Sequence, residues 1–359
     1  MPFWKKKKPP AQDADDFHTK VDAFWKWFES RSQYFLDQID AGKCGDLQPE
    51  ISKNVNAMWP SFAWVFGPPP EGKNGHSFTL SGEGLIERQF LTEEWLRRAP
   101  EIENWTFYAS RQPGDVQPQV TMEIGENSFE FGGFWVSPVI DEENELVDIT
   151  AWHPSFETAE ENIKSTALFL MLDEILGEYG VDTWLGVIET SDAKLAEAMP
   201  ALELRDFLHD LEVERGWKKY PPPESYSLYQ LPEPTNTYLR GDTVSGTSSN
   251  MKLVGKYLNN HGPVENDLEG SGAEFLFIAF DSGILPDGEQ VIFRGEIEDA
   301  LDSALRAESA GHVTGGAIGQ QFTYIDVINF RGAGGRALLE QAIVAKGLPE
   351  STAIHQFTE

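Results

Sequence analysis

The clearest periodic pattern lies near the start of the chain, in the segment FHTKVDAFWKWFESRSQYFLDQI at residues 17–39. Apolar side chains recur there every three or four positions, which predicts a helix with one broad aromatic face. Trp27 and Tyr34 lie on a flank of this face. We expect the face to pack on a sheet. The alternative is that Trp27 and Tyr34 bind a partner, because aromatic residues are frequent in interfaces as well as in cores.

Strand and helix patterns then alternate up to residue 231. Strand-like runs flank the turn GPPPEGKNG, and four more extended segments lie between residues 104 and 153. One helix is predicted in RQFLTEEWLRRAPEI, ended by Pro100. A longer one is predicted in AEENIKSTALFLMLDEILGEYG, whose nearly continuous apolar run indicates a central, buried position. Residues 17–231 are therefore expected to form an α+β domain with a mostly antiparallel sheet and helices on one face, after a tail of residues 1–16.

A second domain is predicted at residues 251–359. Residues 232–250 are small, polar and weakly periodic, which is typical of an interdomain linker. After them come the strand AEFLFIAF, the helix GEIEDALDSALRAESAG, two strands around a glycine-rich stretch, the helix GGRALLEQAIVAKG and the strand TAIHQFT. This β-α-β-β-α-β order is that of a ferredoxin-like domain, again with helices on one face of an antiparallel sheet.

The glycine-rich stretch GHVTGGAIGQQF, residues 311–322, has the appearance of a phosphate-binding loop. Such a loop needs a Lys and a Ser or Thr after its last glycine and must begin a helix, and neither condition is met. We therefore predict a β-hairpin in which the glycines allow a bulge or a close backbone approach. The alternative is a groove that binds a ligand or a partner strand, with these candidate residues: Thr314, Gly315, Gly316, Gly319, Gln320 and Gln321.

Charge is the most unusual feature of the composition. The net charge is −31, or −35 without the four lysines Lys5 to Lys8. A body this acidic repels phosphate backbones and anionic lipids, so we expect no direct nucleic-acid binding, but the charge suits a basic protein partner. The single cysteine, Cys44, excludes an intrachain disulfide, and no apolar run is long enough to span a bilayer. A cytoplasmic location is expected.

The sequence contains no set of residues typical of a catalytic or metal site. The seven histidines are isolated from one another, no motif indicates a zinc site, a cofactor or a serine nucleophile, and none is expected. The favoured hypothesis is a non-enzymatic regulatory protein that binds a partner through its acidic surface. The alternative is an enzyme or small-ligand-binding protein with a site in an interdomain cleft, where Asp148, His153 or Glu174 would converge.

Four segments carry a resemblance to known proteins: FWKWF, WVFGPPPEGK, LDEILGEY and GHVTGGAIGQQFTYIDV. With them the chain resembles a bacterial family of two-domain acidic proteins whose N-terminal part is a domain of unknown function. The C-terminal part is loosely similar, in element order and acidity, to regulator B, the inhibitor of ribonuclease E. The resemblance implies the two-domain architecture and a regulatory role, and no known activity.

Overall fold

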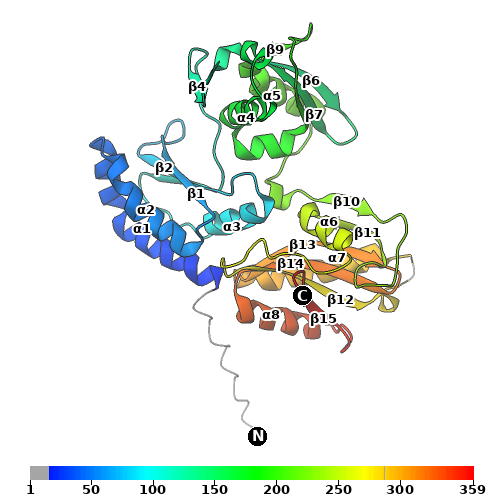
Figure 1. Ribbon diagram of the computed structural model, residues 1–359. Helices are drawn as coiled ribbons and strands as arrows, with labels where there is room; N and C mark the ends of the chain where they lie inside the picture. The colour runs from blue at the N-terminus through cyan, green and yellow to red at the C-terminus, as the bar shows by residue number, and fades with distance from the viewer. Residues whose placement is uncertain (1–15, 287) are drawn as a thin grey trace.

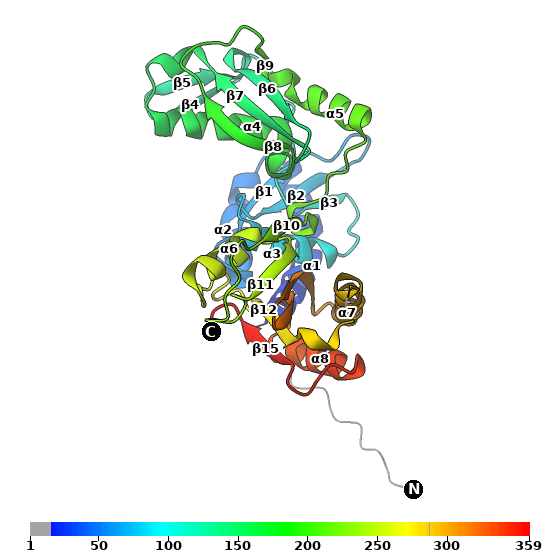
Figure 2. The same cartoon turned by 90° about the vertical axis from the view of Figure 1, so that its right-hand side faces the viewer.

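The computed structural model describes residues 16–286 and 288–359, and its elements form three units (Figure 1). We call residues 16–108 the aromatic module, residues 111–217 the middle lobe and residues 227–359 the sheet unit. In both views the middle lobe stands apart at one end of the molecule (Figure 2). The predicted tail, with Lys5 to Lys8, lies outside the described residues apart from Asp16.

The aromatic module begins with the predicted first helix. Asp16 caps that helix by accepting a hydrogen bond from the Thr19 amide at 2.7 Å. Its aromatic face packs on a three-stranded sheet of order β1-β2-β3, in which β2 and β3 are parallel. The short second helix was not predicted from the sequence, because its apolar stripe has only three residues, Ile51, Val55 and Met58. The elements are α1 (Phe17–Asp40), α2 (Gln48–Met58), β1 (Ala63–Gly67), β2 (His76–Ser81), α3 (Ile86–Arg97) and β3 (Trp105–Tyr108).

The middle lobe has its own sheet, of order β8-β7-β6-β9, and a separate β4-β5 hairpin. β7 and β8 are parallel, so residues 17–231 contain two mixed sheets and an antiparallel hairpin and not one mostly antiparallel sheet. The elements are β4 (Thr121–Ile124), β5 (Asn127–Glu130), β6 (Trp135–Asp141), β7 (Leu146–Trp152), α4 (Glu161–Trp184), β8 (Leu185–Thr190), β9 (Met199–Pro200) and α5 (Leu204–Arg215).

The long helix α4 is not buried all round, contrary to the expectation from its apolar run. Ala167, Leu168, Met171 and Leu172 are buried, but Phe169 and Leu170 are exposed. The reason is that the lobe's sheet covers α4 from one side only, so the apolar run extends past the buried face. The helix is also interrupted at Gly177, whose backbone has φ 73° and ψ 166°.

The sheet unit contains the predicted β-α-β-β-α-β order as β12-α7-β13-β14-α8-β15, with the four strands adjacent in the order β13-β14-β12-β15. β10 and β11 extend the same sheet beyond β13. The α+β class predicted from the sequence is thus confirmed. The elements are β10 (Ser227–Gln230), β11 (Thr243–Ser248), α6 (Met251–Asn260), β12 (Glu274–Asp281), α7 (Gln290–Ala307), β13 (Gly311–Gly319), β14 (Phe322–Asn329), α8 (Gly332–Ala345) and β15 (Ala353–Gln356).

The segment expected to be a linker, 232–250, is an integral part of this sheet. Its strand β11 lies between β10 and β13, and Arg240, Asp242 and Thr243 are buried. The Arg240 guanidinium is fully buried and forms an ion pair with Asp326 of β14, with Nη2 3.2 Å from Oδ2. Because these polar groups are paired inside the protein, the composition of the segment gave a misleading indication of solvent exposure.

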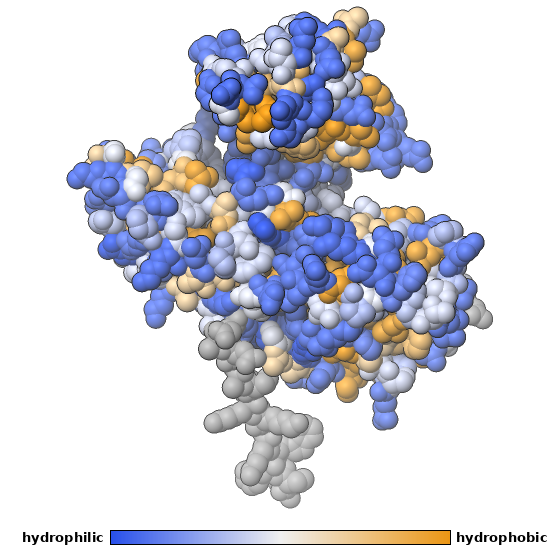
Figure 3. Space-filling view, viewed as in Figure 1, coloured by the Kyte–Doolittle hydropathy of each residue, from blue (hydrophilic) through white to orange (hydrophobic). Residues whose placement is uncertain are grey.

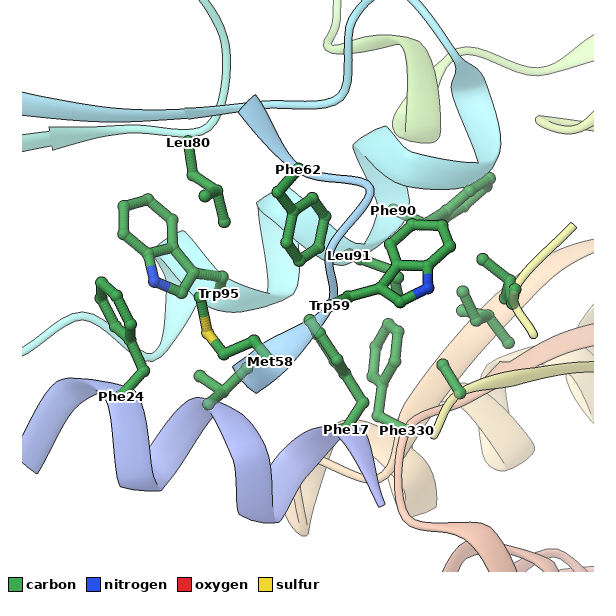
Figure 4. Close-up of a cluster of buried hydrophobic side chains, with 14 of the residues drawn as sticks. Phe17, Phe24, Met58, Trp59, Phe62, Leu80, Phe90, Leu91, Trp95 and Phe330 are labelled. Carbon is green, nitrogen blue, oxygen red and sulfur yellow. The ribbon is translucent and has the colours of Figure 1, made fainter. Parts of the chain in front are cut away.

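The cores divide the chain differently from the predicted boundaries at 231 and 250. Phe275, Phe277 and Ala279 on one face of β12 share a core with the aromatic module, whereas the alternate residues face α7 and α8. Figure 4 shows Phe330 of the sheet unit beside Phe17 and Trp59 of the aromatic module. The middle lobe has a separate core. Among the described residues no helix is long and apolar enough to cross a membrane.

Candidate functional site

The negative charge of the protein is concentrated in the middle lobe. Residues 111–217 contain 24 Asp and Glu against five Lys and Arg, a net charge of −19 out of −31 for the whole chain. Nineteen of these 24 acidic residues are exposed, four are half-buried and Glu178 is buried. The lobe therefore presents a strongly negative surface to a ligand that approaches it.

The five basic residues of the lobe are already engaged within the protein. Lys164 is within 2.7 Å of Glu161 and 2.6 Å of Asp192, and Lys194 lies over the Trp135 ring. Arg205 donates to two backbone carbonyl oxygens. Arg111 forms ion pairs with Glu83 and Asp173, and Arg215 forms ion pairs with Glu142 and Glu214. Most of the lobe's acidic side chains therefore form no ion pair with a cation from the described part of the chain.

An apolar pair stands on this acidic surface. Phe169 and Leu170 of α4 are 47% and 44% exposed. One helical turn further along lie Asp173 and Glu174, and one turn back lies Thr166, which is exposed. Figure 3 shows apolar side chains at the surface of the middle lobe in the region of α4, with hydrophilic side chains around them. We call Thr166, Phe169, Leu170, Asp173 and Glu174 the α4 surface. Apolar anchors with a polar rim are the usual anatomy of a protein interface.

The glycine-rich stretch forms the hairpin that the sequence predicts. β13 and β14 pair in antiparallel register with an irregularity between Val313 and Gly315. A Cβ on Gly315 would overlap the Thr247 carbonyl oxygen of β11, and one on Gly316 would lie 2.7 Å from the Tyr324 carbonyl oxygen. Glycine is needed at these two positions because neighbouring strands come too close for a side chain.

The residues proposed to line a groove at this hairpin are divided between core and surface. Thr314, Gly315, Gly316 and Gly319 are buried, with β11 on one side and β14 on the other, whereas Gln320 and Gln321 are exposed at the turn. The Asp242 carboxylate accepts the Gln321 amide at 2.8 Å and the Phe322 amide at 2.9 Å. The neighbouring strands flank the glycines within the sheet, and the two glutamines face the solvent at the tip of the hairpin. A pocket of about 230 Å³ beside α7 includes Gly315 in its lining.

Trp27 and Tyr34, the two aromatic candidates of α1, contact a charged pair on α1 and α2. The Trp27 indole N–H donates to Glu50 at 3.4 Å, and the Arg31 guanidinium lies 4.2 Å from the centre of the Tyr34 ring. Arg31 and Glu50 form an ion pair at 3.0 Å. Trp27 is half-buried against the core, and Tyr34 is 40% exposed.

The three residues of the enzyme hypothesis have separate environments. His153 is buried among phenylalanine rings, with Nδ1 accepting the Ser155 amide at 3.0 Å and Nε2 placed 3.2 Å from the Glu130 carbonyl oxygen. Burial lowers the pKa of His153, so the imidazole is neutral and structural. Asp148 accepts the Val187 amide at 2.7 Å, and Glu174 is exposed on α4. Each of the three side chains faces different neighbours.

A cleft of about 660 Å³ is present where the three units meet. Burial raises the pKa of Asp182, which lines it, to about 6 despite a hydrogen bond from Gln89, and Glu178 and Asp173 raise it further. Sequence reasoning missed this residue, because one carboxylate among 59 acidic residues carries no visible signal. The other lining residues include Ile86, Asn144, Glu145, Thr183, Lys218, Lys219, Tyr220, Glu224, Tyr226 and Ser249.

Two further observations bear on function. Within residues 16–286 and 288–359, no three His, Cys, Asp or Glu side chains are grouped so that they would hold a metal ion. The resemblance to a bacterial two-domain family, and to the ribonuclease E inhibitor, stays a prediction. No family model, no curated protein and no solved structure matches the chain.

Proposed function

We propose that this protein is a non-enzymatic binding or regulatory protein whose middle lobe engages a basic protein partner. The single observation that carries the proposal is the concentration of charge, −19 out of −31 in residues 111–217. Electrostatic attraction over the lobe increases the association rate of a cationic partner and disfavours nucleic acids.

Electrostatic attraction alone does not hold a partner in place, and the α4 surface supplies apolar side chains that can be buried in the complex. Exposed rim charges mainly change association rates and salt dependence, whereas buried apolar anchors determine how slowly a complex dissociates. Phe169 and Leu170 are the apolar residues on the exposed side of α4, and Asp173 and Glu174 are next to them. A partner with an apolar pocket beside lysine or arginine side chains fits this surface.

The test is capture of partners from a lysate by the immobilised full-length protein at low and high salt. We expect a basic protein to be retained at low salt, to be released at high salt, and to be lost from the Phe169→Ala/Leu170→Ala variant at low salt. Val213→Ala is the matched control, because Val213 is a 72% exposed apolar residue on α5 of the same lobe. Equal retention by the wild type and the double variant would contradict the role of the α4 surface, and no salt-sensitive partner would contradict the proposal itself.

A second candidate function is supported by the cleft between the three units. Its volume of about 660 Å³ is within the size range of small-ligand sites, and Asp182, whose pKa is raised to about 6, is suitable for proton transfer near neutral pH. A thermal-shift screen of small molecules on the wild type and on Asp182→Asn tests it. A compound that stabilises the wild type and not the variant would support a ligand site in the cleft.

A further inference from the structure

A larger cavity lies where the start of α1 meets the sheet unit, away from the middle lobe. Its volume is about 760 Å³, which is within the size range of small-ligand sites. One wall is formed by α1, and the others are formed by the loop before β12, the start of α8 and the end of β15. In Figure 1 the start of α1 lies against the sheet unit. The cavity is therefore built jointly by the aromatic module and the sheet unit.

Backbone hydrogen bonds fix the start of α1 against the sheet unit. The Phe17 amide donates to the Gly272 carbonyl oxygen at 3.2 Å, and the His18 amide donates to the Phe330 carbonyl oxygen at 3.0 Å. The Phe17 and Phe330 rings are in contact, with their centres 5.9 Å apart (Figure 4). The residues that line the cavity are thus held in position before a ligand enters, which lowers the entropic cost of binding.

Asp16 has an acceptor atom that the described part of the protein leaves without a donor. Its Oδ1 atom caps α1 by accepting the Thr19 amide at 2.7 Å. Its Oδ2 atom is buried and has no hydrogen-bond partner, and the residue, only 2% exposed, lines the cavity. An unpaired buried carboxylate oxygen is costly, so this atom points to a donor that a ligand supplies. A positively charged amine would provide both the donor and the opposite charge.

The start of α8 provides hydrogen-bond donors on another wall of the cavity. The amides of the first helical residues have no partner within a helix, and no side chain of the described residues caps this one. Gly332 and Ala333, the first two residues of α8, line the cavity. The N-terminus of a helix has a partial positive charge, so it suits a carboxylate.

Arg336 adds a cation one turn further along α8. Its guanidinium forms an ion pair with Glu274 of β12, in which Nε donates to Oε1 at 2.9 Å and Nη2 donates to Oε2. This pair uses two of the five N–H groups of the guanidinium, and the side chain is 34% exposed. The charged residues that line the cavity are two acids and two bases: Asp16, Glu274, Lys20 and Arg336. This balance distinguishes the cavity from the acidic surface elsewhere, which repels carboxylates.

We propose that this cavity binds a small zwitterion, such as a free amino acid, with its ammonium group at Asp16 and its carboxylate at the start of α8. Asp16 and Gly332 each lie two residues from one end of the hydrogen bond between His18 and Phe330. Two residues span at most about 7 Å, so one small molecule can reach both groups. A purely anionic ligand would leave Oδ2 of Asp16 without a donor, and a purely cationic one would not use the α8 amides. The site does not depend on the partner proposed for the middle lobe.

A thermal-shift screen of the full-length protein with the standard amino acids and 4-aminobutanoate tests the proposal. Isothermal titration calorimetry then measures the dissociation constant of each compound that stabilises the protein. We expect at least one compound to bind, and its N-acetyl and carboxamide derivatives to bind about tenfold more weakly, because each derivative lacks one charge. The proposal would be overturned if none of the compounds bound, or if both derivatives bound as tightly as the parent compound.

Two variants locate the ligand in this cavity. Asp16→Asn keeps a side chain that caps α1 but removes the charge, so binding should weaken about tenfold while the helix stays folded. Ala333→Asp places a carboxylate in the first turn of α8, where it stabilises the helix and repels the carboxylate of the ligand, again with a loss of about tenfold. Asp46→Asn and Gln341→Glu are matched controls, because they make the same changes of charge at exposed sites outside the cavity, and they should bind like the parent. An unchanged affinity in Asp16→Asn or in Ala333→Asp would overturn the assignment.

Discussion

The substitution Asp326→Asn removes the carboxylate that forms an ion pair with Arg240, and it should strongly destabilise the sheet unit. Arg240 is fully buried and Asp326 is 2% exposed, so no water replaces the lost charge. The guanidinium lies between the rings of Phe277, Tyr324 and Phe357, with its central carbon 5.1 to 5.2 Å from their centres. Burial disfavours its charge, and Asp326 is the main reason that the pKa of Arg240 stays above its usual value.

The expected magnitude follows from leaving a buried cation without a counter-ion. Breaking a buried ion pair by removing one partner costs about 3–5 kcal/mol, and the retained amide of Asn places the expected loss near ~3 kcal/mol. The control is Glu142→Gln, which breaks the ion pair of Glu142 with Arg215, whose side chains are 57% and 37% exposed. Such an exposed pair contributes less than about 1 kcal/mol.

Urea unfolding of the full-length protein, monitored by circular dichroism, measures the loss of stability in Asp326→Asn and in Glu142→Gln. The double variant Arg240→Met/Asp326→Asn should be more stable than the sum of the two single losses predicts, because removing both charges leaves neither unpaired. The reasoning would be refuted if Asp326→Asn unfolded at the same urea concentration as the parent. Strict additivity in the double variant would also refute it.

Three further outcomes are expected. Gly315→Ala should destabilise the protein by about 1–3 kcal/mol, because its Cβ would overlap the Thr247 carbonyl oxygen, and a lower urea midpoint would show it. Trp25→Phe should remove about 2–3 kcal/mol, since the indole donates a buried hydrogen bond of 2.9 Å to the Trp95 carbonyl oxygen and stacks on that ring; differential scanning calorimetry would detect the loss. Burial, together with Arg306 and Arg97, lowers the pKa of His312 to about 3, so its imidazole NMR signals should not titrate between pH 5.5 and pH 8, whereas a midpoint near 6.5 would show that His312 is accessible to solvent.

Local features of the fold were predictable from the sequence because each depends on a short stretch of the chain. The aromatic stripe of α1 and the β-α-β-β-α-β order of the sheet unit both follow from periodicity within single elements. The hairpin at residues 311–329 was predictable from its glycines, which exclude a phosphate loop and permit close strands.

Features that depend on packing between distant segments were not predictable in this way. Periodicity shows that β12 is apolar on both faces, but not that one face meets α3, where Phe90 packs on Phe275 although it is 185 positions earlier in the chain. The small, polar composition of residues 232–250 indicated a linker, because the pairing that buries Arg240 is with Asp326, 86 positions away in the sequence. Asp182 is distinctive only because folding brings Gln89 and the cleft to it.

The shared core of the aromatic module and the sheet unit has a consequence for synthesis of the chain. Phe17 and Trp59 leave the ribosome long before Phe330 and Phe357, with which they share one core. The middle lobe, whose core uses only residues 116–217, is able to fold on the nascent chain in the meantime. Until translation ends, the part of this core that meets the sheet unit, around Phe17 and Phe90, has no cover, so newly made chains should be clients of holdase chaperones at this stage.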